Sequence, residues 1–356
     1  MDNPLVIKAG RTALAHIREN GLRPSDIAAV LGASGAAKWL SIYGLDRMIF
    51  SRWLNGISHR IYLFGTSIGA WKLAAAAQAR PDQSLDCLKD AYIRQSYRGR
   101  VAREQVTMES LKILDRFLTP GNIREILDNP VFRLGISAVR CRGLLAMENT
   151  AVQAGGMGAA FAMNLFARKT QSLFFQRTLF QVPDPKPCPL DLDDFRTTRV
   201  ALTPENVKPA LLASGSIPII MEGVTGIPGA PKGGYRDGGL LDYHPAFQLR
   251  PEHKGLILYP HFYPDIIPGW FDKKISGRRA ASDLVDRIVL ISPSPGFVSG
   301  LPFGRIPDRE DFRRFHGRET LRFRAWNTAA NRSLALGEAF FHVVESGRIR
   351  ELAIPF

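Results

Sequence analysis

A serine flanked by glycines is the residue whose surroundings point most clearly to chemistry. Residues 65–69 form a GxSxG pattern that consists of Gly65, Thr66, Ser67, Ile68 and Gly69. The preceding IYLF is apolar and strand-like, and the following AWKLAAAA is rich in helix formers. A sharp strand-to-helix turn needs glycines on both sides of the serine, and it lifts the hydroxyl above the strand end. The context therefore favours a nucleophilic Ser67 over an ordinary glycine-rich turn.

A serine hydroxyl needs a base that accepts its proton. One candidate is Asp237, because it begins the run Asp237-Gly238-Gly239, in which glycines let the chain bend closely around a neighbour. The same three residue types are also common in tight turns, so a purely structural turn is an alternative interpretation. Histidine is the usual base, and none of the seven lies in a distinctive motif: His16, His59, His244, His253, His261, His316 and His342.

A third stretch of small residues, LGASGAAKWL at 31–40, follows a short apolar run. It contains the first glycine and the lysine of a phosphate-binding GxxxxGK[ST] loop. However, Ala37 replaces the second glycine, and Trp39 replaces the hydroxyl residue that holds magnesium. These replacements argue against nucleotide binding.

The order of these motifs resembles the patatin-like phospholipase family. A small-residue loop after the first predicted strand, GxSxG, ASGSIP at 213–218 and DGG at 237–239 follow one another within residues 15–245. The resemblance implies a serine lipid acyl hydrolase with Ser67 as nucleophile, Asp237 as general base, and no catalytic histidine, metal or cofactor. It also implies an oxyanion loop made of Gly35, Ala36, Ala37 and Lys38. This loop departs from the family's glycine-rich pattern in its alanines and in Trp39.

The elements that must position these residues alternate along the first part of the chain. The apolar pattern predicts a helix at 10–19, a strand at 27–31, a helix at 36–54 and a strand at 61–64. Strand, helix and strand in this order imply a right-handed parallel crossover. Only one clear strand precedes 61–64, whereas an α/β-hydrolase normally places several strands before its nucleophile. This count argues against a Ser-Asp-His triad.

The rest of the chain is predicted to be mainly helical at 84–170, interrupted by a strand at 131–141. Later elements are strands at 178–182, 195–203, 255–262 and 287–292, a helix at 204–213, a long loop at 226–239 and a long final helix at 327–347. The alternation predicts one large α/β domain over 1–356 with a mainly parallel sheet and inserted helices. The resemblance adds that it is a patatin-like α/β/α fold with a catalytic core at 15–245, completed by a basic segment at 246–356.

Composition is typical of a folded globular protein, with 45% hydrophobic and 22% charged residues. The three cysteines Cys87, Cys141 and Cys188 have no metal-ligand or CxxC spacing, so neither a disulfide framework nor a zinc site is expected. The first residues do not have the pattern of a signal peptide, and no apolar stretch reaches the length of a membrane span. We therefore expect a cytoplasmic protein.

The formal net charge of +14 favours anionic partners. Basic residues are concentrated in KKISGRR at 273–279 and in residues 305–326, where Phe312, Phe315, Phe323 and Trp326 interrupt them. The segment is interpreted as a solvated basic face, or as a surface that brings the enzyme into peripheral contact with an anionic membrane. Met157, Phe161, Met163 and Phe166 form an apolar stripe that is more typical of a core than of an acyl pocket or a bilayer-facing surface.

Two other functions stay open at this stage. One is a conventional serine esterase or thioesterase in which a histidine such as His244 or His261 is the base. The other is a non-catalytic basic protein that binds membranes or nucleic acid. The preferred hypothesis has a lipid ester as substrate, and under it no nucleic-acid partner is expected.

Overall fold

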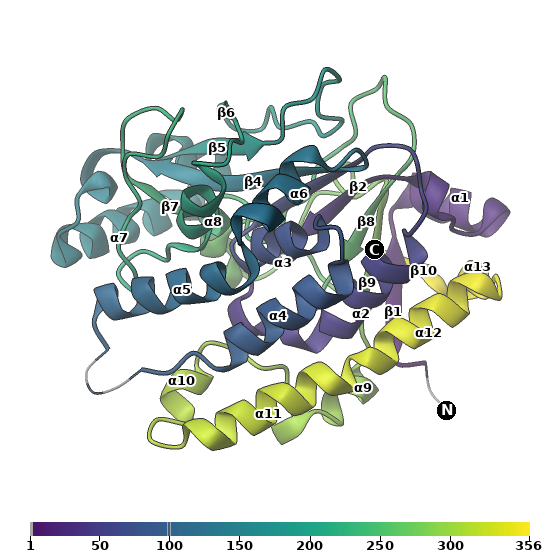
Figure 1. Ribbon diagram of the computed structural model, residues 1–356. Coiled ribbons are helices and arrows are strands. Elements are labelled where there is room, and N and C mark those ends of the chain that lie inside the picture. Colours follow the sequence, from purple (N-terminus) through teal and green to yellow (C-terminus); the bar gives the residue numbers. More distant parts are fainter. Residues whose placement is uncertain (1–2, 98, 100) are drawn as a thin grey trace.

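A computed structural model describes residues 3–97, 99 and 101–356, and its centre is a ten-stranded sheet (Figure 1). The strand order is β10-β1-β9-β8-β2-β3-β4-β5-β6, and β7 pairs with β4 outside this path. The strands are β1 (Leu5–Ala9), β2 (Ile27–Gly32), β3 (Ile61–Thr66), β4 (Phe132–Cys141), β5 (Phe175–Gln181), β6 (Thr197–Ala201), β7 (Tyr235–Asp237), β8 (Leu256–Pro260), β9 (Ile288–Pro293) and β10 (Ala353–Pro355). Strands β9, β8, β2, β3 and β4 are parallel to one another, which confirms the predicted α/β fold with a mainly parallel sheet.

Helices flank this sheet, with α3 and α4 over the face turned to the viewer in Figure 1. The helices are α1 (Arg11–Asn20), α2 (Tyr43–Met48), α3 (Ile68–Ala76), α4 (Pro81–Ile93), α5 (Arg103–Phe117), α6 (Pro120–Asp128), α7 (Thr150–Phe166), α8 (Val207–Gly215), α9 (Pro295–Ser299), α10 (Asp311–Arg314), α11 (Glu319–Arg332), α12 (Leu334–Glu345) and α13 (Ile349–Leu352). Every residue of β8 and β9 is buried, as expected for parallel strands covered on both faces. Within the part of the chain that the structure describes, no helix combines the length and the apolarity that crossing a membrane requires.

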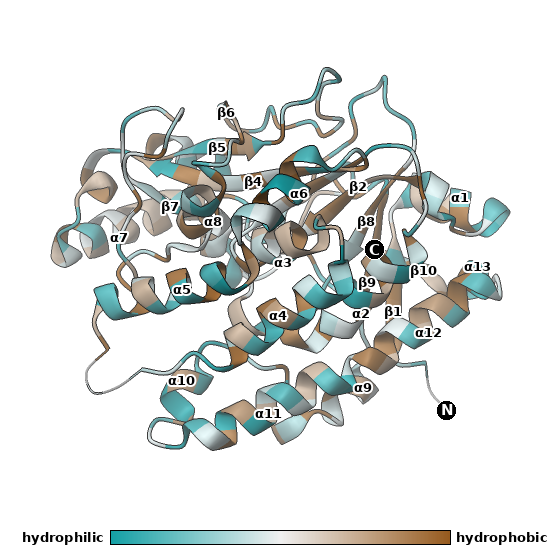
Figure 2. Ribbon diagram, viewed as in Figure 1, coloured by the Kyte–Doolittle hydropathy of each residue, from teal (hydrophilic) through white to brown (hydrophobic). Residues whose placement is uncertain are grey.

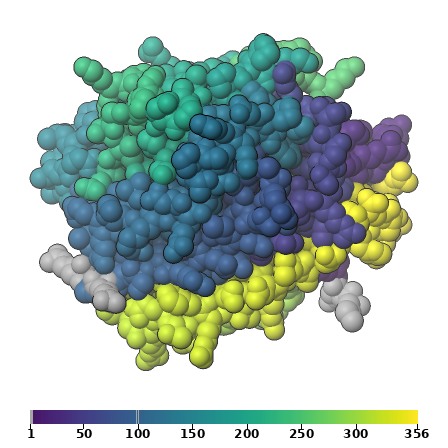
Figure 3. Space-filling view, in the orientation of Figure 1, coloured from purple at the N-terminus to yellow at the C-terminus, as the bar shows by residue number. Residues whose placement is uncertain are grey.

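Two long predicted helices are each divided into shorter segments, and these segments cross closely. Residues 36–54 form a 3₁₀ segment (Ala36–Ile42), then α2, then a π turn (Ile49–Trp53). The final helix is α11 and α12, which meet at Ser333 and form an edge of the molecule (Figure 3). The Gly44 N–H donates to Ser333 Oγ at 2.8 Å, and a Cβ on Gly44 would lie 2.4 Å from the Leu334 backbone. This close crossing is a tertiary contact, so local periodicity did not indicate it.

Three strands were not predicted. Strand β1 lies between β9 and β10, and its pairing with β10 joins residues almost a chain length apart. Strand β7 lies inside the segment 226–239, which was predicted to be a loop, and it is only three residues long. Because β1 and β2 both precede β3, the prediction of a single preceding strand is wrong. The strand count therefore no longer argues against a histidine-containing triad, and the choice of base depends on the geometry of the site.

Candidate active site

Ser67 lies at the turn between β3 and α3, in a backbone conformation that is rare for a residue with a side chain. Its φ is 54° and its ψ is −132°. Such strained residues cost about 1–3 kcal/mol and persist where the surrounding structure holds them. The turn packs directly on the end of β2, since a Cβ on Gly69 would lie 2.2 Å from the Gly32 carbonyl oxygen. The GxSxG glycine is therefore required for close packing of the turn.

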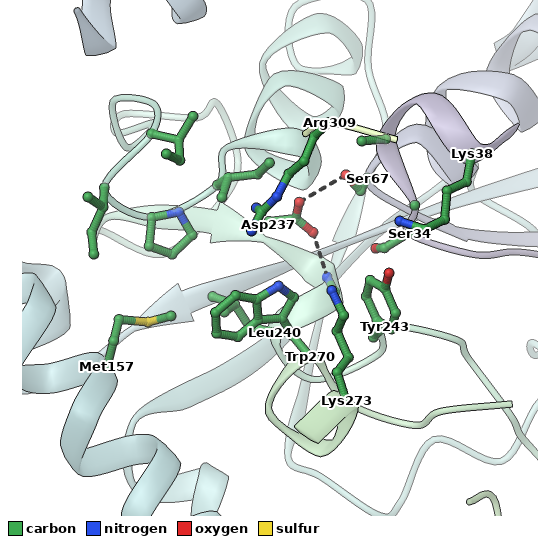
Figure 4. Close-up of a pocket in the computed structure, with 17 residues that line it drawn as sticks. Ser34, Lys38, Ser67, Met157, Asp237, Leu240, Tyr243, Trp270, Lys273 and Arg309 are labelled. Atoms are coloured by element: carbon green, nitrogen blue, oxygen red, sulfur yellow. Dashed lines mark hydrogen bonds between the residues drawn. The ribbon is translucent and has the colours of Figure 1, made fainter. Parts of the chain in front are cut away.

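Asp237 ends β7 and is the hydrogen-bond partner of Ser67 (Figure 4). The Ser67 hydroxyl donates to Asp237 Oδ2 at 2.9 Å, and the Gly239 N–H donates to Asp237 Oδ1 at 2.7 Å. Each of the two side chains is 8% exposed. Burial raises the pKa of Asp237 to about 6, although the hydrogen bonds from Gly239 and Ser67 favour the carboxylate. The fold thus brings together two groups that lie 170 positions apart in the sequence.

The ASGSIP motif holds both members of this pair from behind. The Ser67 N–H donates to Ser214 Oγ at 2.9 Å, and Ser214 Oγ donates to the Ser137 carbonyl of β4 at 2.7 Å. The Asp237 N–H donates to the Ser216 carbonyl at 3.0 Å. Sequence reasoning found the motif but not these contacts. The sequence signal for this part of the site was the position of ASGSIP between GxSxG and DGG.

The predicted oxyanion loop follows β2 and is tied to the strand that carries Ser67. The Ser34 hydroxyl donates to Thr66 Oγ1 at 2.9 Å, and the Thr66 hydroxyl donates to the Asp242 carbonyl at 2.8 Å. Ala36 has a φ of 50°, a left-handed conformation that glycine adopts more easily. Of the four predicted loop residues, Gly35, Ala36 and Lys38 line a cavity together with Ser67, whereas Ala37 is fully buried and does not line it.

Two cavities meet at Ser67. The first has a volume of about 240 Å³ and also contains Asp237, Met157, Tyr243 and Trp270. The second has a volume of about 720 Å³ and is mainly apolar. Its lining includes Ile68, Trp71, Tyr92, Tyr97, Val106, Ile113, Met221 and Phe312. One bound molecule can therefore extend into both cavities and pass Ser67.

Three cations surround the serine–aspartate pair: Lys38, Lys273 and Arg309 (Figure 4). Burial lowers the pKa of Lys273 to about 8, and the charges of Lys38 and Arg309 act in the same direction. Burial likewise lowers the pKa of Lys38. Lys273 and Arg309 come from the two basic segments of the sequence, which therefore do not merely form a solvated face. The cluster gives the first cavity a positive lining that suits an anionic group.

The histidines named as alternative bases lie elsewhere. His244 and His261 are buried with their rings 4.3 Å apart, and neither lines a cavity with Ser67. Burial lowers the pKa of His261 to about 3 and that of His244 well below its usual value. His316 does line the larger cavity. Among the described residues, however, the hydroxyl of Ser67 donates its hydrogen bond to Asp237.

The apolar stripe on α7 is only partly a core. Met157 and Phe161 are partly buried, and Met157 lines the first cavity. By contrast, Met163 is 36% exposed and Phe166 is 84% exposed, so the core interpretation is wrong for these two residues.

No protein-family profile matches this sequence, and no curated protein matches it. Among solved structures, the crystal structure of VipD from Legionella pneumophila is similar at 12% identity and a TM-score of 0.31. The match covers 72% of this chain and 53% of VipD, so the chain spans about half the length of that protein. At this distance the activity has to be argued from the site itself.

Proposed function

We propose that this protein is a serine lipid acyl hydrolase of the patatin-like type, with Ser67 as nucleophile and Asp237 as general base. The observation that carries the proposal is the 2.9 Å hydrogen bond from the Ser67 hydroxyl to Asp237, made by a strained serine that opens on two cavities. A nucleophile and base within hydrogen-bond reach, with the base held by a third group, are the geometric signature of covalent catalysis. Here the third group is the Gly239 N–H.

The proposed reaction has two steps. Asp237 accepts the hydroxyl proton while Ser67 Oγ attacks the ester carbonyl carbon, and the resulting tetrahedral oxyanion collapses to an acyl-serine. The alcohol leaves with the proton that Asp237 returns. Asp237 then takes a proton from water as the water oxygen attacks the acyl-serine, and it returns this proton to Ser67 Oγ as the carboxylic acid is released. A raised pKa makes Asp237 a stronger base than a solvated carboxylate, and this supports its assignment.

Backbone N–H groups near Ser67 are the proposed oxyanion donors. The first N–H groups of a helix lack intrahelical acceptors, and α3 begins at Ile68, directly after the nucleophile. The loop at Gly35 and Ala36 faces the same cavity and leads into a 3₁₀ segment. Donors aimed at a developing oxyanion typically contribute several kcal/mol to catalysis. We assign this role to the backbone of Gly35, Ala36 and Ile68.

The two cavities support a lipid ester with an anionic group as substrate. The larger cavity is lined by aromatic and aliphatic side chains that suit a fatty-acyl chain. The smaller one holds Lys38, Lys273 and Arg309 beside the dyad, which suits a phosphate or carboxylate on the leaving alcohol. A phospholipid or lysophospholipid combines both features.

Labelling with a fluorophosphonate probe tests the proposal. Wild type should be labelled and should hydrolyse a short-chain soluble ester, whereas Ser67→Ala should do neither. Asp237→Asn should lose at least about a hundredfold in activity. Ser216→Ala is the matched control, because it changes a buried serine of the same motif whose hydroxyl donates to Leu212 rather than to the dyad. A folded wild type that is not labelled would overturn the proposal.

The choice of base has its own test. Ala substitutions of His244, His261 and His316 should leave the labelling rate within a few-fold of wild type. If one of them abolishes labelling in a folded protein while Asp237 is intact, the serine–histidine alternative is correct. Esters of equal chain length, with and without a phosphate on the leaving group, then test the substrate class, and the anionic ester should have the lower KM.

A further inference from the structure

After its first residue, Thr150, helix α7 exposes only apolar residues. Between 151 and 167, ten residues are exposed: Ala151, Ala154, Gly155, Gly158, Ala159, Ala162, Met163, Leu165, Phe166 and Ala167. The helix contains no charged residue at all. Figure 2 accordingly shows α7 mostly in white to brown, whereas the exposed helix α11 carries much teal. A surface helix normally has the opposite arrangement, with polar residues outward.

Two polar residues of this helix, Gln153 and Asn164, point inward and anchor it. Gln153 and Asn164 are each 1% exposed. Gln153 Nε2 donates to the Met147 carbonyl at 2.6 Å, and Asn164 Nδ2 donates to Asp272 Oδ1 at 2.7 Å. These bonds hold the helix in one orientation. The outward direction of the apolar face is therefore specified by the structure and is not an accident of loose packing.

Further exposed apolar side chains surround the same helix. Leu144, Met147 and Leu173 are each more than half exposed. Together with Met163, Leu165 and Phe166 they make six of the 14 large hydrophobic side chains that are exposed among the described residues. We call the face formed by residues 144–173 the α7 face. Contiguous apolar surface of this kind marks a site of interaction with another apolar surface.

A basic segment adjoins the α7 face. Arg278 Nη1 donates to the Asn164 carbonyl at 2.8 Å, which joins the KKISGRR segment at 273–279 to the C-terminal half of α7. Lys274 and Arg279 of this segment are exposed, and so is Lys169 just after the helix. The acidic residue Glu148 is paired with Arg103 and Arg236. The surroundings of the apolar face are thus positively charged.

The α7 face is continuous with the candidate active site. Met157, on the same helix, lines the cavity that contains Ser67, and so do Lys273 of the basic segment and Trp270, which lies three residues before that segment (Figure 4). Material that reaches the cavity from the α7 side therefore passes apolar and cationic side chains together.

We propose that the α7 face and the adjoining basic segment dock the protein on an anionic lipid bilayer, with the cavity mouth turned toward the membrane. Apolar side chains that enter the bilayer interface and cations that face anionic lipids both strengthen peripheral binding. Each basic residue near an anionic surface adds binding, whereas a second copy of this chain would bring the same positive charges together. The inference builds on the proposed function, because a lipid-ester substrate would enter directly from the bilayer.

The test measures binding to vesicles in a Ser67→Ala background, so that hydrolysis plays no part. The vesicles are phosphatidylcholine alone, or phosphatidylcholine with an equal amount of phosphatidylglycerol. We expect cosedimentation with the anionic vesicles that weakens as salt is added. Leu165→Ser/Phe166→Ser should lower the partition coefficient at least about tenfold, as expected when two apolar side chains no longer enter the interface. Lys274→Ala/Arg279→Ala should lower it by about tenfold on anionic vesicles only.

Matched controls come from the other exposed surfaces. Leu321→Ser/Phe303→Ser changes the same two residue types at positions that are 40% and 60% exposed, and Arg348→Ala/Arg350→Ala removes two cations near α13, at the opposite end of the molecule from α7 (Figure 1). Both should bind like the parent. Equal binding by the α7 variants and their controls would overturn the inference. So would a dimer in solution that the Leu165→Ser/Phe166→Ser change dissociates, since the face would then belong to a second copy.

Different measurements test the proposed hydrolase function and the proposed membrane docking, so one can be contradicted without the other. Hydrolysis of a soluble short-chain ester by the otherwise wild-type Leu165→Ser/Phe166→Ser protein reports on the catalytic site, and it should be unchanged. Loss of vesicle binding with intact soluble-ester hydrolysis supports docking by the α7 face. Vesicle binding through this face without any hydrolysis would keep the docking inference and remove the proposed function.

Discussion

The backbone N–H of Ser67 donates to the hydroxyl of Ser214 at 2.9 Å, so helix α8 supports the strained turn at Ser67. Ser214 in turn connects the turn to β4, because its own hydroxyl donates to the Ser137 carbonyl of that strand. The Ser67 N–H is thereby satisfied at a place where the chain cannot continue a β ladder. Three elements, β3, β4 and α8, are joined at the residue proposed to do the chemistry.

Ser214→Ala should lower kcat by about tenfold and leave KM nearly unchanged. The substitution leaves a buried N–H without its acceptor, which costs about 1–3 kcal/mol, and it loosens the turn that aims the Ser67 hydroxyl. Steady-state kinetics on a soluble ester, together with a thermal melt, measures both effects. Ser216→Ala is the control, since it keeps the carbonyl that accepts from Asp237. Equal kinetics for the two variants would contradict the role given to Ser214.

The activity should depend on pH with an acidic limb near pH 6. The base must be ionised to accept the hydroxyl proton, and burial raises the pKa of Asp237 to about 6. The kcat/KM should therefore fall about tenfold for each pH unit below that value, since this ratio reports on the free enzyme. Initial rates between pH 4 and 8, with circular dichroism to confirm folding, supply the test. A limb at pH 4 or lower would mean that the working carboxylate is solvated.

Asp237→Asn should make the protein more stable at neutral pH while removing activity. The folded pKa of about 6 lies above the ordinary 3.8, so the folded state binds more protons than the unfolded state between these values. Stability from this group is therefore present at low pH and is lost as pH rises toward 6. The loss corresponds to roughly 3 kcal/mol at pH 8, and the neutral amide avoids it.

Chemical denaturation at pH 4.5 and pH 8 measures this effect. The stability gain of Asp237→Asn should be largest at pH 8 and should fall to about a third of that value at pH 4.5. A gain of equal size at both pH values would show that it does not arise from ionisation. Functional groups that lower the stability of the folded state are a common feature of active sites.

A buried ion pair anchors α3, the helix that follows Ser67. Lys72 of α3 donates to both oxygens of Asp46 on α2 at 2.8 and 2.9 Å, and both side chains are almost fully buried. Lys72→Met should destabilise the protein by about 3–5 kcal/mol, because it leaves a buried carboxylate without a partner. The double variant Lys72→Met/Asp46→Leu should recover much of this loss, and urea denaturation compares the two. A double variant no more stable than the single one would argue against this account.

The central part of the fold could be predicted because its signals are local. Strand β3 and helix α3 follow from an apolar run and an alanine-rich tail on either side of GxSxG. The parallel pairing of β2 with β3 follows from the helical segment between them, and it brings the loop at 33–38 beside Ser67. Asp237 was assigned from the order of the motifs, since glycines beside an aspartate are on their own more typical of a turn. The structure places these glycines in close packing, because a Cβ on Gly238 would lie 2.2 Å from the Ser137 carbonyl oxygen.

What could not be predicted depends on contacts between distant segments. Arg177 of β5 binds both carboxylate oxygens of Asp242, and the Asp242 carbonyl accepts a hydrogen bond from the Thr66 hydroxyl. No local sequence pattern predicts this network. The outward direction of the apolar face of α7 also depends on a contact between distant segments. The sequence pattern predicts an apolar helix, but it does not say which side of the helix faces the protein. That side is set by the hydrogen bond from Asn164 to Asp272, and Asp272 lies in another segment.

Ala36 is where the loop departs most informatively from a glycine-rich pattern, because its φ is 50°. Alanine in this conformation is strained, and glycine is not. Ala36→Gly removes the strain but makes the unfolded chain more flexible, so the expected gain in stability is small, about 0–1 kcal/mol. The same change on an unstrained residue, Ala28→Gly in strand β2, should instead destabilise, since a strand glycine costs about 0.5–1 kcal/mol. Denaturant midpoints of the two variants give opposite signs if the loop has the described conformation. If both variants lose stability equally, Ala36 is not held in a left-handed conformation.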